Sequence, residues 1–130
     1  MKVFLTGGTG FVGSEVLRQL VAAGPNVKAL VREGSEDKLT VTDGVEIHPG
    51  DISDAASLVG GPEGCDAVIH LIGIIREFPG RGVTFKKMHV VGTENVLEAA
   101  EEQGVSRYLH MSSNGTRESS NTGYHRTKWQ

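Results

Sequence analysis

The chain has 130 residues, of which 38% are hydrophobic and 22% charged, and this balance excludes an intrinsically disordered tail. A net charge of −3 and an aromatic content of 5% leave no basic or stacking surface for nucleic acid or an anionic membrane. Cys65 is the single cysteine, which excludes an internal disulfide. No apolar run approaches the roughly 18 residues of a membrane span, so we expect a cytoplasmic protein without a membrane span.

The first predicted strand, residues 3–5, is a short apolar run that stops at a glycine-rich turn. A helix is expected from about Phe11, because apolar side chains then recur at helical spacing: Val12, Val16 and Leu20. Gly24 followed by Pro25 should end this helix, since a C-terminal glycine before proline is a common stop.

Four more predicted strands follow, and they cover residues 27–32, 45–48, 66–71 and 106–111. Residues 33–44 are polar and predicted as loop with some helix, and residues 54–59 as a short helix or turn. Residues 73–82 are predicted as a second loop, and residues 83–103 as a long helix. Another helix is expected from Tyr124 onward. Because the strands are apolar runs between helices, we predict an α/β fold, a Rossmann-type doubly wound parallel sheet.

One domain is expected to cover residues 1–130. The sequence stops inside its last predicted helix, and natural domains rarely end there. We therefore expect these residues to be the N-terminal part of a longer chain, truncated before the end of the domain.

The segment TGGTGFVG, from Thr6 to Gly13, carries the most specific motif. Its glycines fit both G-x-x-G-x-x-G and G-x-G-x-x-G. The first glycine allows a tight turn, the middle one lets the backbone approach a pyrophosphate, and the last lets the helix lie close to the sheet. The motif follows a predicted strand and opens a predicted helix, which favours dinucleotide binding over an ordinary glycine-rich turn.

Arg32 ends the second predicted strand, where an acidic residue would bind the ribose 2′-hydroxyl of NAD. An arginine at this place suits the 2′-phosphate of NADP instead. Glu33 is adjacent and can serve a ribose, so NADP is favoured while NAD stays open as the alternative.

These motifs together resemble the short-chain dehydrogenase/reductase superfamily, in its extended and atypical branches, which include NAD-dependent epimerases and dehydratases. The segments 89–96 (HVVGTENV) and 104–108 (GVSRY) are similar to the nucleotide-binding accessory subunit of respiratory complex I and its bacterial homologues. The fingerprint and the resemblance together imply a cofactor site formed by Gly7, Thr9, Gly10, Phe11, Val12, Gly13, Arg32, Asp51, Ile52, Leu71, Ile72 and Gly73. Such proteins also carry further sheet strands and a C-terminal substrate region.

The same resemblance assigns a catalytic set. Tyr124 and Lys128 match the family's Y-x-x-x-K motif, and Ser113 matches its catalytic serine. A tyrosine and a lysine at i, i+4 share one helix face, and a lysine cation lowers the pKa of a nearby phenol. Tyr124 would be the acid/base group, Lys128 its electrostatic helper and Ser113 the holder of a substrate carbonyl. The chain departs from the pattern where His89 replaces the asparagine common at that helix position, and where few residues separate Ser113 from Tyr124.

Two classes of function remain open at this point. One is an NAD(P)-binding oxidoreductase or epimerase/dehydratase-type enzyme acting by hydride transfer on an unknown small molecule. The other is a non-catalytic dinucleotide-binding structural, assembly or sensor protein, and a homo-oligomer or larger complex is compatible with both. For His89 a core or pocket-edge position is favoured, with a catalytic role as the alternative, and the spacing of the remaining histidines indicates no metal site.

Overall fold

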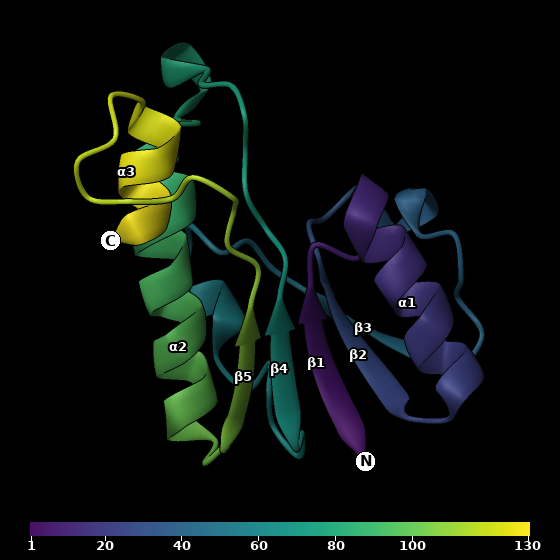
Figure 1. Cartoon of the computed structure of the whole chain (residues 1–130). Helices are drawn as coiled ribbons and strands as arrows, with labels where there is room; N and C mark the ends of the chain where they lie inside the picture. Colours follow the sequence, from purple (N-terminus) through teal and green to yellow (C-terminus); the bar gives the residue numbers. More distant parts are fainter.

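A computed structural model describes all of residues 1–130 and is built around one five-stranded parallel sheet (Figure 1). The strands are β1 (Lys2–Thr6), β2 (Asn26–Val31), β3 (Val45–Pro49), β4 (Ala67–His70) and β5 (Arg107–His110). Their spatial order is β3-β2-β1-β4-β5, and every neighbouring pair is parallel. The order therefore reverses between β1 and β4, and open α/β sheets bind their ligands at such a switch point.

Helices cover both faces of the sheet, which confirms the predicted doubly wound α/β fold. On one face lies α1 (Phe11–Ala23), and on the other lies α2 (Gly92–Glu102) (Figure 1). A π-helical segment, η4 (Lys86–Val91), leads directly into α2, and α3 (Gly123–Trp129) lies beside η4 at the carboxyl end of the sheet. Three 3-10 turns complete the connections, namely η1 (Glu36–Lys38), η2 (Ala55–Leu58) and η3 (Pro79–Arg81).

Side chains that alternate along the strands divide the core in two. Phe4 of β1 belongs to the cluster beneath α2, where it is buried together with Val68 and Val96. Leu5, the next residue, belongs to the cluster beneath α1 together with Leu17. Successive strand residues point to opposite faces, so a sheet covered on both sides needs continuous apolar runs.

Several sequence predictions differ from the structure in detail, mostly by one or two residues at the ends of elements. β4 and β5 are shorter at both ends than the predicted ranges 66–71 and 106–111. The long predicted helix begins as η4 at Lys86 rather than at Val83. On α1 the buried stripe is centred on Leu17, with no exposed surface, whereas Val12 is 49% exposed, because the first turn projects beyond the carboxyl end of β1 (Figure 1).

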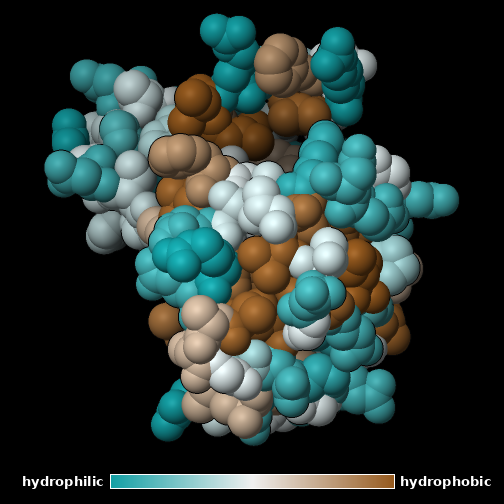
Figure 2. Space-filling model, turned by 90° about the vertical axis from the view of Figure 1, so that its right-hand side faces the viewer, coloured by the Kyte–Doolittle hydropathy of each residue, from teal (hydrophilic) through white to brown (hydrophobic).

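Several large hydrophobic side chains remain exposed at the surface. Phe11 is 95% exposed and Ile75 is 89% exposed, and both follow strands at the carboxyl end of the sheet. Figure 2 shows brown, hydrophobic residues at the surface near the top of the molecule, the end toward which the strands point. On the edge strand β5, Leu109 is 54% exposed. None of the helices combines the length and the apolar character that crossing a bilayer requires.

Candidate functional site

A cavity of about 260 Å³ opens at the carboxyl ends of the strands, above the switch point between β1 and β4. The loops that follow β1, β2, β3 and β4 all contribute to its wall. Val83 and Met88 close the cavity from the side of η4. Its lining residues are Gly7, Thr9, Gly10, Leu30, Arg32, Gly50, Asp51, Ile52, Leu71, Ile72, Gly73, Ile74, Val83 and Met88. Loops distant in the sequence meet here because parallel strands end at one edge.

Most of the predicted cofactor residues therefore lie around one cavity, and three do not line it: Phe11, Val12 and Gly13. Five lining residues were not predicted: Leu30, Gly50, Ile74, Val83 and Met88. Leu30 could have been predicted from the sequence, because it lies two residues before the predicted cofactor residue Arg32, and residues two apart on a strand share a face. Gly50 and Ile74 directly adjoin predicted segments, whereas Val83 and Met88 are brought in by tertiary packing.

The glycine loop has the geometry that its motif predicts. Gly7 has a φ of +80°, which favours glycine, and the backbone N–H of Gly10 donates to the Gly7 carbonyl at 3.0 Å. A β-carbon at Gly13 would overlap the Gly7 carbonyl oxygen, so only glycine lets α1 start this close to the strand end. The first N–H groups of α1 lack helical partners and sit at the positive end of its dipole.

The loop after β3 is held in place from two sides. One carboxylate oxygen of Asp51 accepts hydrogen bonds from the backbone N–H and the hydroxyl of Ser53, at 2.9 and 2.8 Å. From α2, the side-chain amide of Asn95 donates to the Ile52 carbonyl at 2.7 Å. A β-carbon at Gly92 would come within 2.5 Å of Ile52, so this helix also needs glycine there. The segment GTEN of the middle helix thus positions the cavity wall.

Arg32 extends from the end of β2, where it is exposed and lines the cavity. The ion pairs of the chain join Lys2 to Glu46 and Arg18 to Glu15, so the Arg32 guanidinium is not paired with a carboxylate. An exposed, unpaired guanidinium at a cavity rim suits a phosphate group, because its fork of donors matches phosphate oxygens.

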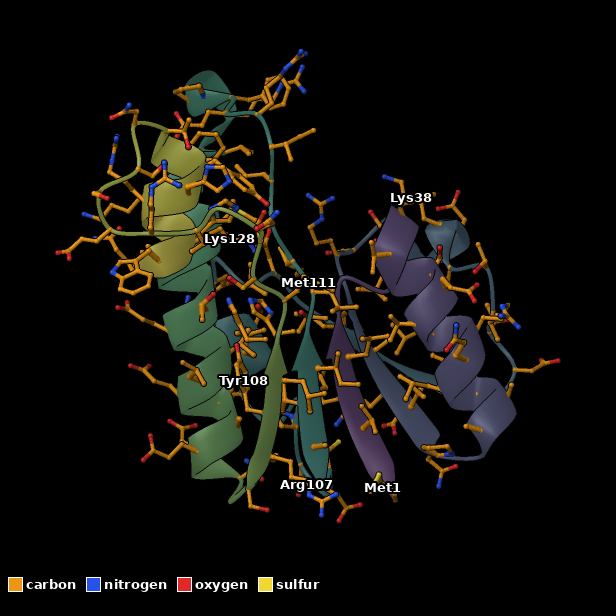
Figure 3. The ribbon with its side chains drawn as sticks, viewed as in Figure 1. Met1, Lys38, Arg107, Tyr108, Met111 and Lys128 are labelled. Atoms are coloured by element: carbon orange, nitrogen blue, oxygen red, sulfur yellow. The ribbon has the colours of Figure 1, made fainter.

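Lys128 lies against the cavity wall, at the upper end of the sheet close to Met111 (Figure 3). Its Nζ donates to the Met111 carbonyl at 3.0 Å, and a β-carbon at Gly73 would lie 2.9 Å from that Nζ. Burial lowers the pKa of the Lys128 ammonium below its ordinary value, because desolvation disfavours the charged form.

Tyr124 precedes Lys128 on α3, and its ring lies edge-on to His89 with a centroid distance of 5.2 Å. Ser113 lies in the loop between β5 and α3, where its carbonyl accepts the backbone N–H of Thr116 at 3.2 Å. No hydrogen bond joins the hydroxyls of Ser113 and Tyr124, and none of the predicted catalytic residues lines the cavity itself. The structure thus brings Lys128 to the cavity wall and leaves the other two outside it.

Two buried histidines lie beneath this end of the site. His70 is hydrogen-bonded to Thr6 at 2.6 Å and to Thr93 at 3.3 Å, and burial lowers its pKa to about 3. Burial also lowers the pKa of His89 to about 4, with Lys128 nearby adding to the effect. Both rings are therefore neutral at pH 7. No group of three or more His, Cys, Asp or Glu side chains is arranged to hold a metal ion.

Residues 3–127 match the NAD dependent epimerase/dehydratase family. The chain belongs to this family. Its predicted membership of the extended short-chain dehydrogenase/reductase group is thereby confirmed. The match begins in β1 and ends in α3, so it includes every element that lines the cavity.

Named relatives of the chain include enzymes from bacteria and plants. The chain is 34% identical over 119 residues to a 3 beta-hydroxysteroid dehydrogenase/Delta 5-->4-isomerase of Mycobacterium tuberculosis, covering 87% of this chain and 32% of that protein. It is 32% identical over 120 residues to cinnamoyl-CoA reductase 1 of Oryza sativa, covering 87% and 34%. The chain thus spans about a third of the length of these relatives.

Solved structures show the same relationship. A short-chain dehydrogenase/reductase superfamily protein from Agrobacterium tumefaciens, solved with bound NAD, superimposes with a TM-score of 0.78 at 26% identity. That match covers 98% of this chain and 42% of the other. A UDP-galactose 4-epimerase superimposes with a TM-score of 0.74 at 26% identity, covering 98% and 48%.

Proposed function

We propose that residues 1–130 form the dinucleotide-binding domain of a longer NAD(P)-dependent oxidoreductase or epimerase/dehydratase-type enzyme. The observation that carries the proposal is the glycine turn in the cavity wall, where Gly7 and Gly10 line the cavity and Gly13 packs against the Gly7 carbonyl. A β-carbon at Gly10 would meet only the Gly7 carbonyl, at 3.4 Å, so the space in front of Gly10 is open to a ligand. The family match and the relative solved with bound NAD support the same assignment.

Different residues around the cavity would bind different parts of the cofactor. The N–H groups of the first turn of α1 would hold the pyrophosphate, and Asp51 with Ile52 would line the adenosine end. The unpaired Arg32 guanidinium favours a 2′-phosphate, and hence NADP over NAD. Leu71 to Gly73 would lie along the nicotinamide end, beside Lys128. A nicotinamide cofactor bound there supplies the chemistry of hydride transfer.

The residues that we assign to proton transfer lie on α3. We assign Tyr124 as the group that donates or accepts the proton of the substrate oxygen, because its hydroxyl forms no hydrogen bond within the chain and stays available. Lys128 is held toward Gly73 by its bond to the Met111 carbonyl, which places a cation at the end of the cavity nearest α3. Ser113 would hold the substrate carbonyl from the loop before α3.

A non-catalytic dinucleotide-binding protein is the second candidate. It is favoured by one observation, namely that Ser113 and Tyr124 are not joined by a hydrogen bond and lie outside the cavity lining. Both candidates require the cofactor, so the first experiment addresses binding and the second addresses turnover.

Binding is tested by calorimetric titration of the chain with NADP and with NAD. We expect Gly10→Val to weaken both by more than tenfold, because the new side chain occupies the phosphate position. Its fold should survive, since Gly10 has φ −84° and ψ 179°, which any residue adopts. Gly80→Val, at an uncrowded glycine in η3, is the matched control. Unchanged affinity in a folded Gly10→Val variant contradicts the assignment.

Turnover is tested on the longest natural form of the protein, loaded with the tighter-binding cofactor. A panel of carbonyl compounds and nucleotide sugars is added, and the nicotinamide absorbance near 340 nm is followed, with product analysis for redox-neutral epimerisation. Consumption of a substrate supports the enzyme. Tight binding without change of any substrate supports the second candidate instead.

A further inference from the structure

His89 connects two parts of the site that the sequence keeps far apart. The backbone N–H of Ile74, in the cavity wall after β4, donates to Nε2 of His89 at 3.0 Å. The other ring nitrogen, Nδ1, lies 2.9 Å from the hydroxyl of Thr127 on α3. His89 as a residue is 5% exposed, and its ring lies between these two contacts, so it spans from the cavity wall to the helix that carries Tyr124 and Lys128.

The direction of each hydrogen bond follows from the chemistry of the partners. A backbone N–H can only donate, so Nε2 of His89 has to be the unprotonated nitrogen. The proton of the neutral ring is therefore on Nδ1, which donates to the Thr127 oxygen. The Thr127 hydroxyl in turn donates to the Gly123 carbonyl at 2.8 Å. One tautomer of His89 therefore gives every polar atom in this series a hydrogen-bond partner, and each bond has one possible donor.

The surroundings of the ring keep it in this position. Phe85 stacks on it with a centroid distance of 5.6 Å, and Tyr124 meets it edge-on at 5.2 Å. A β-carbon at Gly73 would lie 3.5 Å from Nε2 and 2.9 Å from the Lys128 nitrogen, so the two side chains share one small space. His89 also lies on the π-helical η4. Such turns are rare in proteins, and those that occur are often found at functional sites.

We propose that His89, as the neutral Nδ1–H tautomer, is a positioning residue that ties the cavity wall at Ile74 to α3 through Thr127. The proposal rests on the proposed function for the identity of what the wall and the helix bind. His89 thereby couples two parts of the site. Its bond to Ile74 orders the nicotinamide end of the cavity, and its bond to Thr127 orders α3. A short helix of seven residues needs such an anchor, because isolated helices of this length are unstable in water.

The tautomer is tested directly on the chain by long-range ¹H–¹⁵N NMR of the histidine rings at pH 7. We expect a His89 ring with a protonated Nδ1 and an unprotonated Nε2. A ring that carries its proton on Nε2, or on both nitrogens, overturns the proposal. This measurement needs no ligand and does not depend on the proposed function.

Two substitutions separate the two arms of the contact. His89→Gln can place an amide oxygen near the former Nε2 and keep the Ile74 bond, while it loses the donor to Thr127. His89→Asn can place an amide nitrogen near the former Nδ1 and keep the Thr127 bond, while it loses the acceptor for Ile74. We expect amide exchange to accelerate across α3 in the first variant and at Ile74 in the second. Thr127→Val should reproduce the α3 effect of His89→Gln.

Dinucleotide affinity supplies the third measurement. One net hydrogen bond corresponds to about a two- to tenfold change, so His89→Asn should weaken NADP binding by this factor while His89→Gln stays close to the parent chain. If both variants accelerate exchange equally in both places, His89 only fills space and the proposal fails. If the parent chain binds no dinucleotide, the proposed function fails, while the tautomer and exchange patterns still decide the role of His89.

Discussion

Gly13 in the first turn of α1 lies directly against the carbonyl oxygen of Gly7, so a β-carbon at position 13 would overlap that oxygen. Gly7 itself turns the chain out of β1 with a positive φ of 80°. The two glycines together bring the N-terminus of α1 to the end of the strand. The same contact therefore serves the stability of the domain and the shape of the proposed phosphate site.

Replacing Gly13 by alanine should destabilise the fold. Overpacking a close contact costs about 1–3 kcal/mol, and here the neighbour is backbone that cannot rotate away. We expect the free energy of unfolding, measured by urea denaturation, to fall by at least that amount. Gly80→Ala is the control, because nothing lies near its β-carbon position, and it should stay within about 0.5 kcal/mol of the parent. Equal effects of the two substitutions would argue against the contact.

Arg32 should decide between the two cofactors. A hydrogen bond to a charged group is worth about 1.5–3 kcal/mol, so Arg32→Ala should weaken NADP binding about ten- to hundredfold and NAD binding little. Arg107→Ala is a matched control, because it removes the same charge at the opposite end of the sheet (Figure 3). Calorimetric titration of each variant with both cofactors measures the difference. Parallel losses for NADP and NAD would show that Arg32 does not read the 2′-phosphate.

Stability should fall in acid because of His70. Its folded-state pKa of about 3 lies below the ordinary 6.5, so the unfolded chain binds a proton that the folded chain refuses. The contribution of the neutral ring is thus complete above about pH 6.5 and is lost as pH falls toward 3, by up to about 4 kcal/mol.

His70→Asn isolates this effect from the carboxylates that titrate in the same range, such as Glu15, whose pKa Arg18 lowers to about 2. The variant should be less stable at pH 7, because the bonds to Thr6 and Thr93 are altered. Its disadvantage should shrink as the pH falls from 6.5 to 4 in chemical denaturation. A disadvantage that stays constant over this range would mean that His70 does not titrate as stated.

Tyr124→Phe should separate catalysis from folding. The Tyr124 hydroxyl forms no hydrogen bond within the chain, so its loss should leave the melting temperature and cofactor affinity close to those of the parent. Turnover by the longest natural form should drop by at least a hundredfold, since a proton donor contributes about 10²–10⁴. Tyr108→Phe on β5, whose hydroxyl lies 3.4 Å from His110, is the control and should retain turnover. Parental turnover by the Tyr124 variant would remove this residue from the mechanism.

The strands, the main helices and the wall of the cavity were largely predictable from the sequence. Val3 to Leu5 followed by a glycine string and an amphipathic helix is a local pattern, and local backbone preferences determine its geometry. Arg32 was predictable as a wall residue because it follows a strand, and the carboxyl ends of parallel strands lie at one edge of the sheet. Asp51 was predicted from the family resemblance.

The roles of Asn95, Met88 and His89 could not be predicted in the same way. Asn95 binds the Ile52 carbonyl and His89 binds Ile74 and Thr127, and each pair is separated by many residues. Helical periodicity indicates only that such a side chain faces inward, not which partner it meets. The position of Ser113 likewise depends on a loop whose path no periodic pattern determines.

The sequence by itself determined the order of strands and helices, the place of the glycine turn and the family. These properties depend on neighbours in the chain: apolar periodicity, glycine at a positive φ, and a helix start after a strand. Only the tertiary structure decided that Lys128 lies against Gly73, that the hydroxyls of Ser113 and Tyr124 form no hydrogen bond with each other, and that His89 bridges the cavity wall and α3. Those relationships arise where η4 and α3 pack across the end of the sheet, and packing between distant segments depends on the shapes of all the side chains in the contact.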